Sequence, residues 1–312
     1  MRVIFMGTPP FAVAMLDGIH QSDHELVAVV SSPDRPAGRG RKLKASAVKE
    51  RALELEIPVL QPEKLRDEGF LKELESYKAD VFVVVAFRML PKLVWQMPKQ
   101  GTFNLHASLL PQYRGAAPIN WAIVNGESET GLSTFFIDEK IDTGALIKQV
   151  KMPIGENENA GSLHDRMMPI GAKLVCETLD AIAEGTAKPI KQESSEVIKE
   201  APKIFKEDLK INFQQKAQTI HNLVRAMSPF PATWANMSVP GFDGTVKILE
   251  TALTNTASTG EPGSLIKDGK QLYIATADRN LELLSLQPQG KKRLKALDFL
   301  NGQEINENSY LF

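Results

Sequence analysis

The stretch Val81-Phe82-Val83-Val84-Val85 is apolar at every position, and it follows a segment with helical spacing of apolar residues, from Leu65 to Tyr77. A strand with apolar side chains on both faces is typical of a parallel sheet that helices cover on both sides. Similar runs occur earlier, at Val3-Ile4-Phe5-Met6 and at Leu26-Val27-Ala28-Val29-Val30, each followed by a helical pattern. This alternation predicts an α/β fold with a Rossmann-like, mostly parallel sheet.

Polar residues follow a short β-prone run at Gly101-Thr102-Phe103. Asn104 and His106 are two residues apart, so their side chains project from the same side of the chain. Ligands of parallel sheets bind at the carboxyl ends of the strands, where these two residues are expected to lie. Asp142 follows in a loop between two further predicted strands. Asn104, His106 and Asp142 are therefore the candidate catalytic residues.

Each candidate also has a simpler interpretation. A single histidine near apolar neighbours is commonly a hydrogen-bonded core residue, and an Asn or Asp near a strand end commonly forms a turn. Ser108 is a polar neighbour, but the sequence assures no base for it, so covalent serine catalysis is not expected. A metal site is not expected either, because the 5 histidines are scattered and there is no cysteine pair.

Composition bounds the class of protein. The 312 residues are 43% hydrophobic, which is enough for two domains with buried cores. Lys and Arg total 37 against 38 Asp and Glu, so a globally basic nucleic-acid-binding protein is excluded and a polyanion must meet local patches. The single cysteine, Cys176, excludes an intrachain disulfide. No signal-peptide pattern and no apolar run of membrane length occur, so a cytoplasmic protein without a membrane partner is expected.

The composition changes after a predicted helix that ends near Glu184. Residues 185–203 are rich in Lys, Glu, Ser and Pro and contain few apolar residues, which indicates a linker. Beyond them, five short predicted strands with turns between them indicate a small barrel, for which the OB-fold is the commonest candidate. The expected domains are residues 1–187, a linker at 188–204, and an OB-fold-like β-barrel domain at 205–312.

Two segments concentrate positive charge. The stretch from Pro33 to Lys44 carries five cationic residues against one acid, and it follows a strand end on the same edge as His106. A second basic run, at residues 291–295, lies in the predicted barrel. Solvated surface is the simpler interpretation of both segments. A flexible cationic arm beside a candidate active site is also what a bulky, anionic substrate needs.

Motifs in order along the chain resemble those of the formyltransferases that use 10-formyltetrahydrofolate. The matching stretches are Phe5 to Pro9, Pro33 to Lys42, Asn104 to Ile119, Asp142 to Gly144 and Leu283 to Pro288. The Asn-x-His motif with a later Asp is shared by the whole family. The arginine-rich loop and the carboxyl-terminal barrel resemble only its tRNA-acting branch. The first set of motifs therefore indicates the type of reaction, and the second indicates the substrate.

The resemblance implies transfer of a formyl group from 10-formyltetrahydrofolate to the α-amine of methionine on initiator methionyl-tRNA, in translation initiation. It implies a monomer without a metal, in which Asn104, His106 and Asp142 are catalytic. The residues implied for folate contact are Phe87, Arg88, Met89, Leu90, Ser108, Leu109, Leu110, Pro111, Ile137 and Asp138. Those implied for tRNA contact are Arg35, Arg39, Arg41, Lys42, Lys44, Lys291, Lys292 and Arg293.

One segment departs from the family pattern. Where the family has Ala-Tyr-Gly after the strand that ends at Val85, this chain has Ala86-Phe87-Arg88-Met89-Leu90, which is one residue shorter. In the family this segment lines the pterin pocket. The contacts to folate in this chain are therefore expected to differ in detail.

Formyl transfer requires an amine to attack an amide-like carbon, with negative charge on its oxygen and loss of a proton from the amine. Asn104 and His106 can donate hydrogen bonds to that oxygen, and Asp142 can orient His106 and manage the proton. The same residues permit formyl transfer to an amino-sugar nucleotide, which the cationic loop and the barrel disfavour. A folate-responsive RNA-binding module without catalysis is the third alternative, which the three polar residues disfavour.

Overall fold

A computed structural model describes residues 1–37, 42–193 and 197–312. These residues form two compact units, and the chain passes from one unit to the other more than once. Unit 1 contains Met1–Pro118, Thr130–Met152 and His164–Glu200, and unit 2 contains Ile119–Glu129, Pro153–Leu163 and Ala201–Phe312. Two short segments from earlier in the sequence, residues 119–129 and 153–163, therefore group with the carboxyl-terminal residues.

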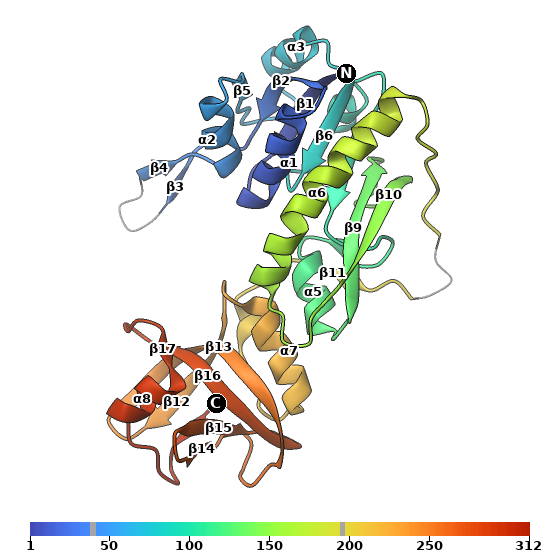
Figure 1. Ribbon diagram of the computed structural model, residues 1–312. Coiled ribbons are helices and arrows are strands. Elements are labelled where there is room, and N and C mark those ends of the chain that lie inside the picture. The colour runs from blue at the N-terminus through green and yellow to red at the C-terminus, as the bar shows by residue number, and fades with distance from the viewer. Residues whose placement is uncertain (38–41, 194–196) are drawn as a thin grey trace. The chain divides into compact units, whose positions relative to one another are not determined.

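Within its described residues, unit 1 is built on a seven-stranded sheet in the order β10-β9-β7-β6-β1-β2-β5 (Figure 1). The strands are β1 (Arg2–Gly7), β2 (Glu25–Val30), β5 (Val59–Leu60), β6 (Val81–Val85), β7 (Thr102–His106), β9 (Glu129–Phe136) and β10 (Leu146–Pro153). Neighbouring strands pair in parallel through β5, β2, β1, β6 and β7, and β9 pairs antiparallel with β7. The predicted Rossmann-like, mostly parallel sheet is confirmed, and β6 is buried at every residue.

The helices of unit 1 are α1 (Pro10–His20), α2 (Ala47–Glu54), α3 (Glu68–Ser76), α4 (Lys92–Trp95) and most of α6 (Ala160–Ala183), whereas most of α5 (Pro118–Val124) groups with unit 2. α3 begins after Asp67, whose carboxylate accepts a hydrogen bond from a backbone amide of the first turn. α1 and α6 pack closely because small residues face each other. A Cβ atom on Gly18 would lie 3.2 Å from the Ala172 Cβ, and one on Gly171 would lie 2.2 Å from the Met15 Cε.

Unit 2 contains a curled sheet whose strand pairs are antiparallel, in the order β14-β15-β16-β13-β12-β18 with β17 beside β16. The strands are β12 (Thr233–Val239), β13 (Phe242–Ala257), β14 (Leu265–Asp268), β15 (Gln271–Ala275), β16 (Arg279–Pro288), β17 (Leu294–Lys295) and β18 (Tyr310–Leu311). The sheet closes where the Leu265 amide donates to the Ser309 carbonyl, 2.9 Å, and the Leu311 amide donates to the Gly263 carbonyl, 2.8 Å.

The predicted small barrel is thus confirmed, its strand pairs are antiparallel, and β17 and β18 are added to the five expected strands. These two strands have two residues each, which is too short for an alternating pattern. The remaining elements are β3 (Arg35–Ala37), β4 (Lys42–Lys44), β8 (Arg114–Gly115), β11 (Glu200–Ala201), a 3-10 turn η1 (Glu207–Leu209), α7 (Ala217–Met227) and α8 (Ala296–Gly302). None of the helices described for this chain is both long and apolar enough to cross a bilayer.

His221 on α7 is buried against the barrel, with 2% of its surface exposed. Its Nδ1 atom lies 3.0 Å from the Thr251 hydroxyl, and its buried Nε2 atom has no hydrogen-bond partner in the described part of the chain. Burial, and then the nearby Arg225 charge, lower the pKa of His221 from 6.5 to about 4. The folded protein therefore holds His221 neutral at a pH where the unfolded chain is protonated.

We expect the free energy of unfolding of unit 2 to decrease as the pH is lowered, because of His221. The unfolded chain binds the proton first, so the stabilisation is complete above about pH 6.5 and is lost as the pH falls toward 4. Between pH 7 and pH 5 the free energy of unfolding should drop by on the order of 2 kcal/mol through His221. Urea unfolding at both pH values tests this. The His221→Gln variant should lose this part of the pH dependence, and an undiminished drop in that variant would contradict the assignment.

Candidate active site and cationic surfaces

His106 is the last residue of β7 and is buried, with 7% of its surface exposed. Its Nε2 atom lies 2.7 Å from the carbonyl oxygen of Tyr113. A carbonyl can only accept, so Nε2 carries a hydrogen and donates it. The Nδ1 atom then faces the Asp142 carboxylate, with 3.6 Å between Nδ1 and Oδ2. The backbone fixes one side of the ring, and the other side is paired with an acid.

Asp142 reaches His106 from the loop that joins β9 to β10. Its backbone has a φ of 54°, a left-handed conformation that costs free energy for a residue other than glycine. The same Oδ2 atom that faces His106 accepts a hydrogen bond from the Gly115 amide at 2.9 Å. Asp142 is therefore more than a turn former, because its carboxylate joins two other segments at the end of β7.

Asn104 completes the group on β7, two residues before His106. It pairs in register with Phe135 of β9, and its side chain is partly buried. Among the described residues, no hydrogen-bond partner occupies its side-chain amide. An amide in this position can donate to an incoming ligand without first breaking a bond. The structure thus brings Asp142 and His106 together, with Asn104 on the same side of the strand.

The Asp142 loop is shaped from within. Asp138, which the family resemblance implies for folate contact, accepts hydrogen bonds from the Thr143 hydroxyl at 2.7 Å and the Lys140 amide at 3.0 Å. A Cβ atom on Gly144 would lie 1.6 Å from the Phe136 carbonyl oxygen, so only glycine fits where the loop returns to β10. Asp138 therefore holds the loop that contains Asp142, whose carboxylate faces His106. The neighbouring Ile137 packs against the core of the sheet.

The departure segment 86–90 lies at the end of β6 and is held from two sides. Leu90 is buried and Phe87 packs on the core, whereas Met89 is 68% exposed. Arg88 donates to the carbonyls of Pro62 at 2.8 Å and Glu63 at 3.1 Å. Burial, and then the charge of Arg35, lower the pKa of Arg88. Its buried Nε has no hydrogen-bond partner in the described residues.

The residues of the segment 108–111 are buried or partly buried, and Ser108 and Leu110 form hydrogen bonds within the protein. Ser108 is fully buried, and its hydroxyl donates to the Gln112 carbonyl at 2.7 Å. The partner of the hydroxyl is a backbone carbonyl and not a base, which agrees with the absence of a serine nucleophile in the expected mechanism. Leu110 is buried, and its amide donates to the Ser133 hydroxyl at 3.1 Å. Leu109 and Pro111 are partly buried.

The cationic loop of unit 1 contains a β hairpin. Strands β3 and β4 pair Arg35 with Lys44, and both of these side chains are exposed. The acid in this stretch is already neutralised, because Asp34 lies 2.8 Å from the Lys49 ammonium. Like charges that face each other across a hairpin, without an acid between them, suit a polyanion. Arg39 and Arg41 lie outside the described residues, and for Lys42 the structure gives only the backbone pairing.

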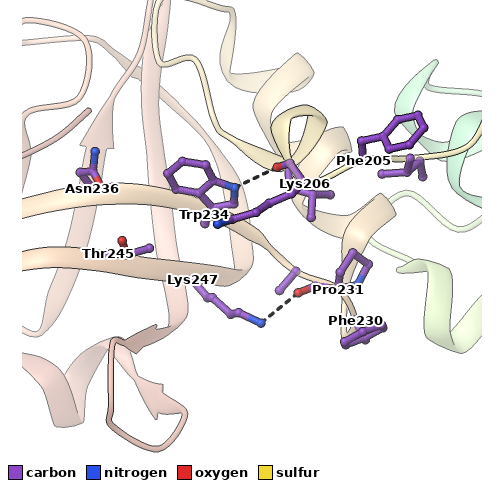
Figure 2. Close-up of a pocket in the computed structure, with 11 residues that line it drawn as sticks. Phe205, Lys206, Phe230, Pro231, Trp234, Asn236, Thr245 and Lys247 are labelled. Atoms are coloured by element: carbon purple, nitrogen blue, oxygen red, sulfur yellow. Dashed lines mark hydrogen bonds between the residues drawn. The ribbon is translucent and has the colours of Figure 1, made fainter. Parts of the chain in front are cut away.

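An aromatic and cationic groove on unit 2 was not predicted from the sequence (Figure 2). Its volume is about 690 Å³. The Trp234 ring lines it, and the ammonium groups of Lys206 and Lys210 lie 5.9 Å and 5.7 Å from the ring centroid. Phe230 and Phe205 are 82% and 56% exposed. Lysines around exposed rings are typical of surfaces that bind single-stranded nucleic acid.

The groove continues toward the basic run of the barrel. Thr245 and Lys247 line it and also line a second hollow of about 380 Å³, which ends at Gly290. Lys291 and Lys292 follow in an exposed turn. Arg293 is partly committed elsewhere, since its guanidinium lies 3.0 Å from the Glu250 carboxylate and 2.7 Å from the Ser285 hydroxyl. Of the predicted basic run, Lys291 and Lys292 thus follow the last lining residue in the sequence, and neither of them lines either hollow.

Two family models match this chain. The model described as formyl transferase matches residues 1–179, and the formyl transferase carboxyl-terminal domain matches residues 203–304. The chain therefore belongs to the formyl transferase family.

Within that family, relatives with high identity are methionyl-tRNA formyltransferases. The protein of that name from Bacteroides fragilis is 49% identical over 98% of this chain and 96% of the relative. The one from Flavobacterium johnsoniae is 49% identical over 100% and 99%.

Solved structures share the fold at low identity. WlaRD, a sugar 3N-formyl transferase in the presence of dTDP and 5-N-formyl-THF, has a TM-score of 0.67 and 22% identity, over 94% of this chain and 99% of that one. HypX from Aquifex aeolicus in complex with tetrahydrofolic acid has a TM-score of 0.65 and 19% identity, over 98% and 48%. At these identities the likeness shows the fold alone. No group of three metal-ligating side chains occurs in the part of the chain that the structure describes.

Proposed function

We propose that this chain transfers a formyl group from 10-formyltetrahydrofolate to the α-amine of methionine on initiator methionyl-tRNA, in translation initiation. The observation that carries the proposal is the pairing of buried His106 with partly buried Asp142 at the carboxyl end of β7, beside an Asn104 amide that has no hydrogen-bond partner among the described residues. Near-full-length relatives named methionyl-tRNA formyltransferase support the choice of acceptor. The proposal includes a monomer that acts in the cytoplasm and requires no metal.

The three residues have separate tasks in this reaction. The bound folate supplies the formyl carbon that the amine attacks. The Asn104 amide donates a hydrogen bond to the formyl oxygen as negative charge develops there. His106 uses Nδ1 for the proton that leaves the amine, because Nε2 is held by the Tyr113 carbonyl. Asp142, 3.6 Å from Nδ1, opposes the positive charge of the imidazolium until the departing nitrogen takes the proton.

The assignment divides the chain by task, with catalysis in residues 1–187, a connecting segment at 188–204, and tRNA contact by the barrel domain at 205–312. Neighbouring structures solved with folate derivatives support folate as the carrier of the formyl group. The groove around Trp234 and the hairpin that pairs Arg35 with Lys44 are the surfaces with the charge that tRNA needs. Arg39 and Arg41 remain part of the proposed tRNA contact.

The experiment that tests the function offers the pure protein 10-formyltetrahydrofolate with one of three acceptors: methionyl initiator tRNA, free methionine, or a nucleotide-linked amino sugar. Mass analysis of each product follows. We expect formylation of the aminoacylated tRNA and almost none of the other two acceptors. Formylation of free methionine at an equal rate, or preferential formylation of the amino sugar, would contradict the proposal.

The groove makes a prediction about tRNA binding. Replacing Lys206 and Lys247 with Ala should weaken tRNA binding and reduce the slope of log affinity against log salt by about one to two units, if each ammonium contacts a phosphate. Titration at several salt concentrations measures the slope. The control replaces Lys267 and Lys270, two exposed lysines outside the groove, and makes the same change in net charge. Equal slopes in the two double variants would remove the groove from the proposed interface.

A further inference from the structure

The segment that composition marks as a linker is fastened to the catalytic loops of unit 1. The amide and carbonyl of Ile190 each bond to Leu146 at 2.8 Å, immediately after the Asp142 loop. We refer to residues 190–193 together with 197–199 as the strap. The match to the first family model ends at residue 179 and the match to the second begins at residue 203, so the strap lies between the two matches.

Gln192 is the strap residue with the most contacts to the site, and it uses both ends of its amide. Its Nε2 atom donates to the carbonyl of Asp142 at 3.0 Å and to the carbonyl of Gly144 at 2.8 Å. Its Oε1 atom accepts from the Arg114 guanidinium, 2.7 Å from Nη2 and 3.3 Å from Nε. One partly buried side chain therefore joins the Asp142 loop to β8, which directly follows Tyr113, the residue whose carbonyl holds His106.

The rest of the strap reaches the other partner of His106. The Tyr113 amide donates to the Lys199 carbonyl at 2.6 Å, and the Lys199 amide donates to the Gln112 side chain at 2.8 Å. Tyr113 is the residue whose carbonyl accepts the Nε2 hydrogen of His106, and it also has a positive φ of 61°. Both groups that orient His106 thus depend on backbone that the strap holds.

We propose that Gln192 is a positioning residue for formyl transfer, which holds the Asp142 carboxylate against His106 through the backbone carbonyls of Asp142 and Gly144. The inference rests on the proposed function. Asp142 has a left-handed backbone in a surface loop, so its position must be enforced from outside the residue. Two hydrogen bonds from one amide, itself fixed by Arg114, supply that constraint. A displacement of a catalytic group by about 1 Å can cost a hundredfold in rate.

The chemistry of the two amide ends makes the proposal specific. A Gln192→Glu variant keeps an oxygen for Arg114 but presents a carboxylate to two carbonyls, so it should displace the loop although the volume is unchanged. A Gln192→Ala variant removes both ends. We expect kcat to fall by about tenfold to a hundredfold in both variants, with KM for the folate and for the tRNA within about twofold of wild type. The adjacent Lys191→Ala variant, whose side chain is 86% exposed, should match wild type.

A double-mutant cycle with Asp142→Asn separates positioning from a general structural effect. If Gln192 acts through the Asp142 carboxylate, Gln192→Ala should lose most of its effect on kcat in the Asp142→Asn background. An equal factor in both backgrounds would overturn the proposal. Wild-type kcat in both Gln192 variants would overturn it as well, while leaving the proposed function intact.

A readout without turnover distinguishes failure of this inference from failure of the proposed function. The Gly115 amide donates to the Asp142 carboxylate, so its hydrogen exchange reports whether the carboxylate is in place. In the full-length protein, we expect faster exchange at Gly115 in Gln192→Ala and unchanged exchange in Lys191→Ala. Unchanged exchange in Gln192→Ala would refute the positioning role, whatever the acceptor of the formyl group proves to be.

Discussion

Replacement of His106, Asn104 or Asp142 by Ala is expected to lower the rate of formyl transfer by about a hundredfold to a thousandfold, with the fold preserved. The loss of one donor to a developing oxyanion has this magnitude, and His106 cannot hold the transferred proton without its acid. Single-turnover measurements with methionyl initiator tRNA give the rate. Far-UV circular dichroism shows whether each variant is folded.

The control for this series is Glu139→Ala, which removes an exposed carboxylate from the same loop as Asp142. Its rate should remain close to wild type. Because the proposed roles of the three residues concern the same charge and the same proton, a double variant should lose less than the product of the single losses. Folded His106→Ala protein with full activity would refute the catalytic assignment.

The second large effect is structural, and it concerns closure of the barrel at Gly263. This residue has a φ of 99°, and a Cβ atom added to it would lie 2.2 Å from the Leu311 carbonyl oxygen. Gly263→Ala should therefore separate β18 from the start of β14, at a cost on the order of 3 kcal/mol in the free energy of unfolding. Urea unfolding of the full-length protein measures this cost.

Gly269→Ala is the matched control, because Gly269 also has a positive φ, of 56°, but nothing lies within 4 Å of the added Cβ. It carries the backbone strain without the collision, and should cost about 1 kcal/mol. Equal costs in the two variants would mean that the contact with Leu311 does not limit closure.

The sequence was most informative where local pattern and burial agree. Val81 to Val85 had to be buried on both faces, and the structure buries all five residues. His106 was also accessible to prediction, since strand alternation places it beside Asn104 and strand ends collect ligand-binding groups. What brings Asp142 to 3.6 Å from His106 is the return of a distant loop, which no local pattern encodes.

The features that were missed depend on contacts between residues far apart in sequence. Gln192 looks like any polar linker residue until its amide is seen between Asp142 and Arg114. Trp234 lies in a strand where an aromatic residue is unremarkable, and only the approach of Lys206 and Lys210 makes it part of a groove. In the sequence, the one sign of this groove was the spacing of Lys203, Lys206 and Lys210. Lysines spaced in this way are also typical of a solvated surface.

Residues 119–129 and 153–163 group with the carboxyl-terminal residues, and this grouping affects when unit 2 can fold during synthesis. The side-chain amide of Asn120 donates to the Ala226 carbonyl, 106 residues later in the chain. The backbone amide of Gly161 donates to the Ser228 carbonyl. On the ribosome, these early segments emerge long before their partners are synthesised. A nascent chain that has reached residue 187 therefore still lacks both acceptors. Unit 2 can therefore be completed only after the residues from Ala201 onward have been synthesised.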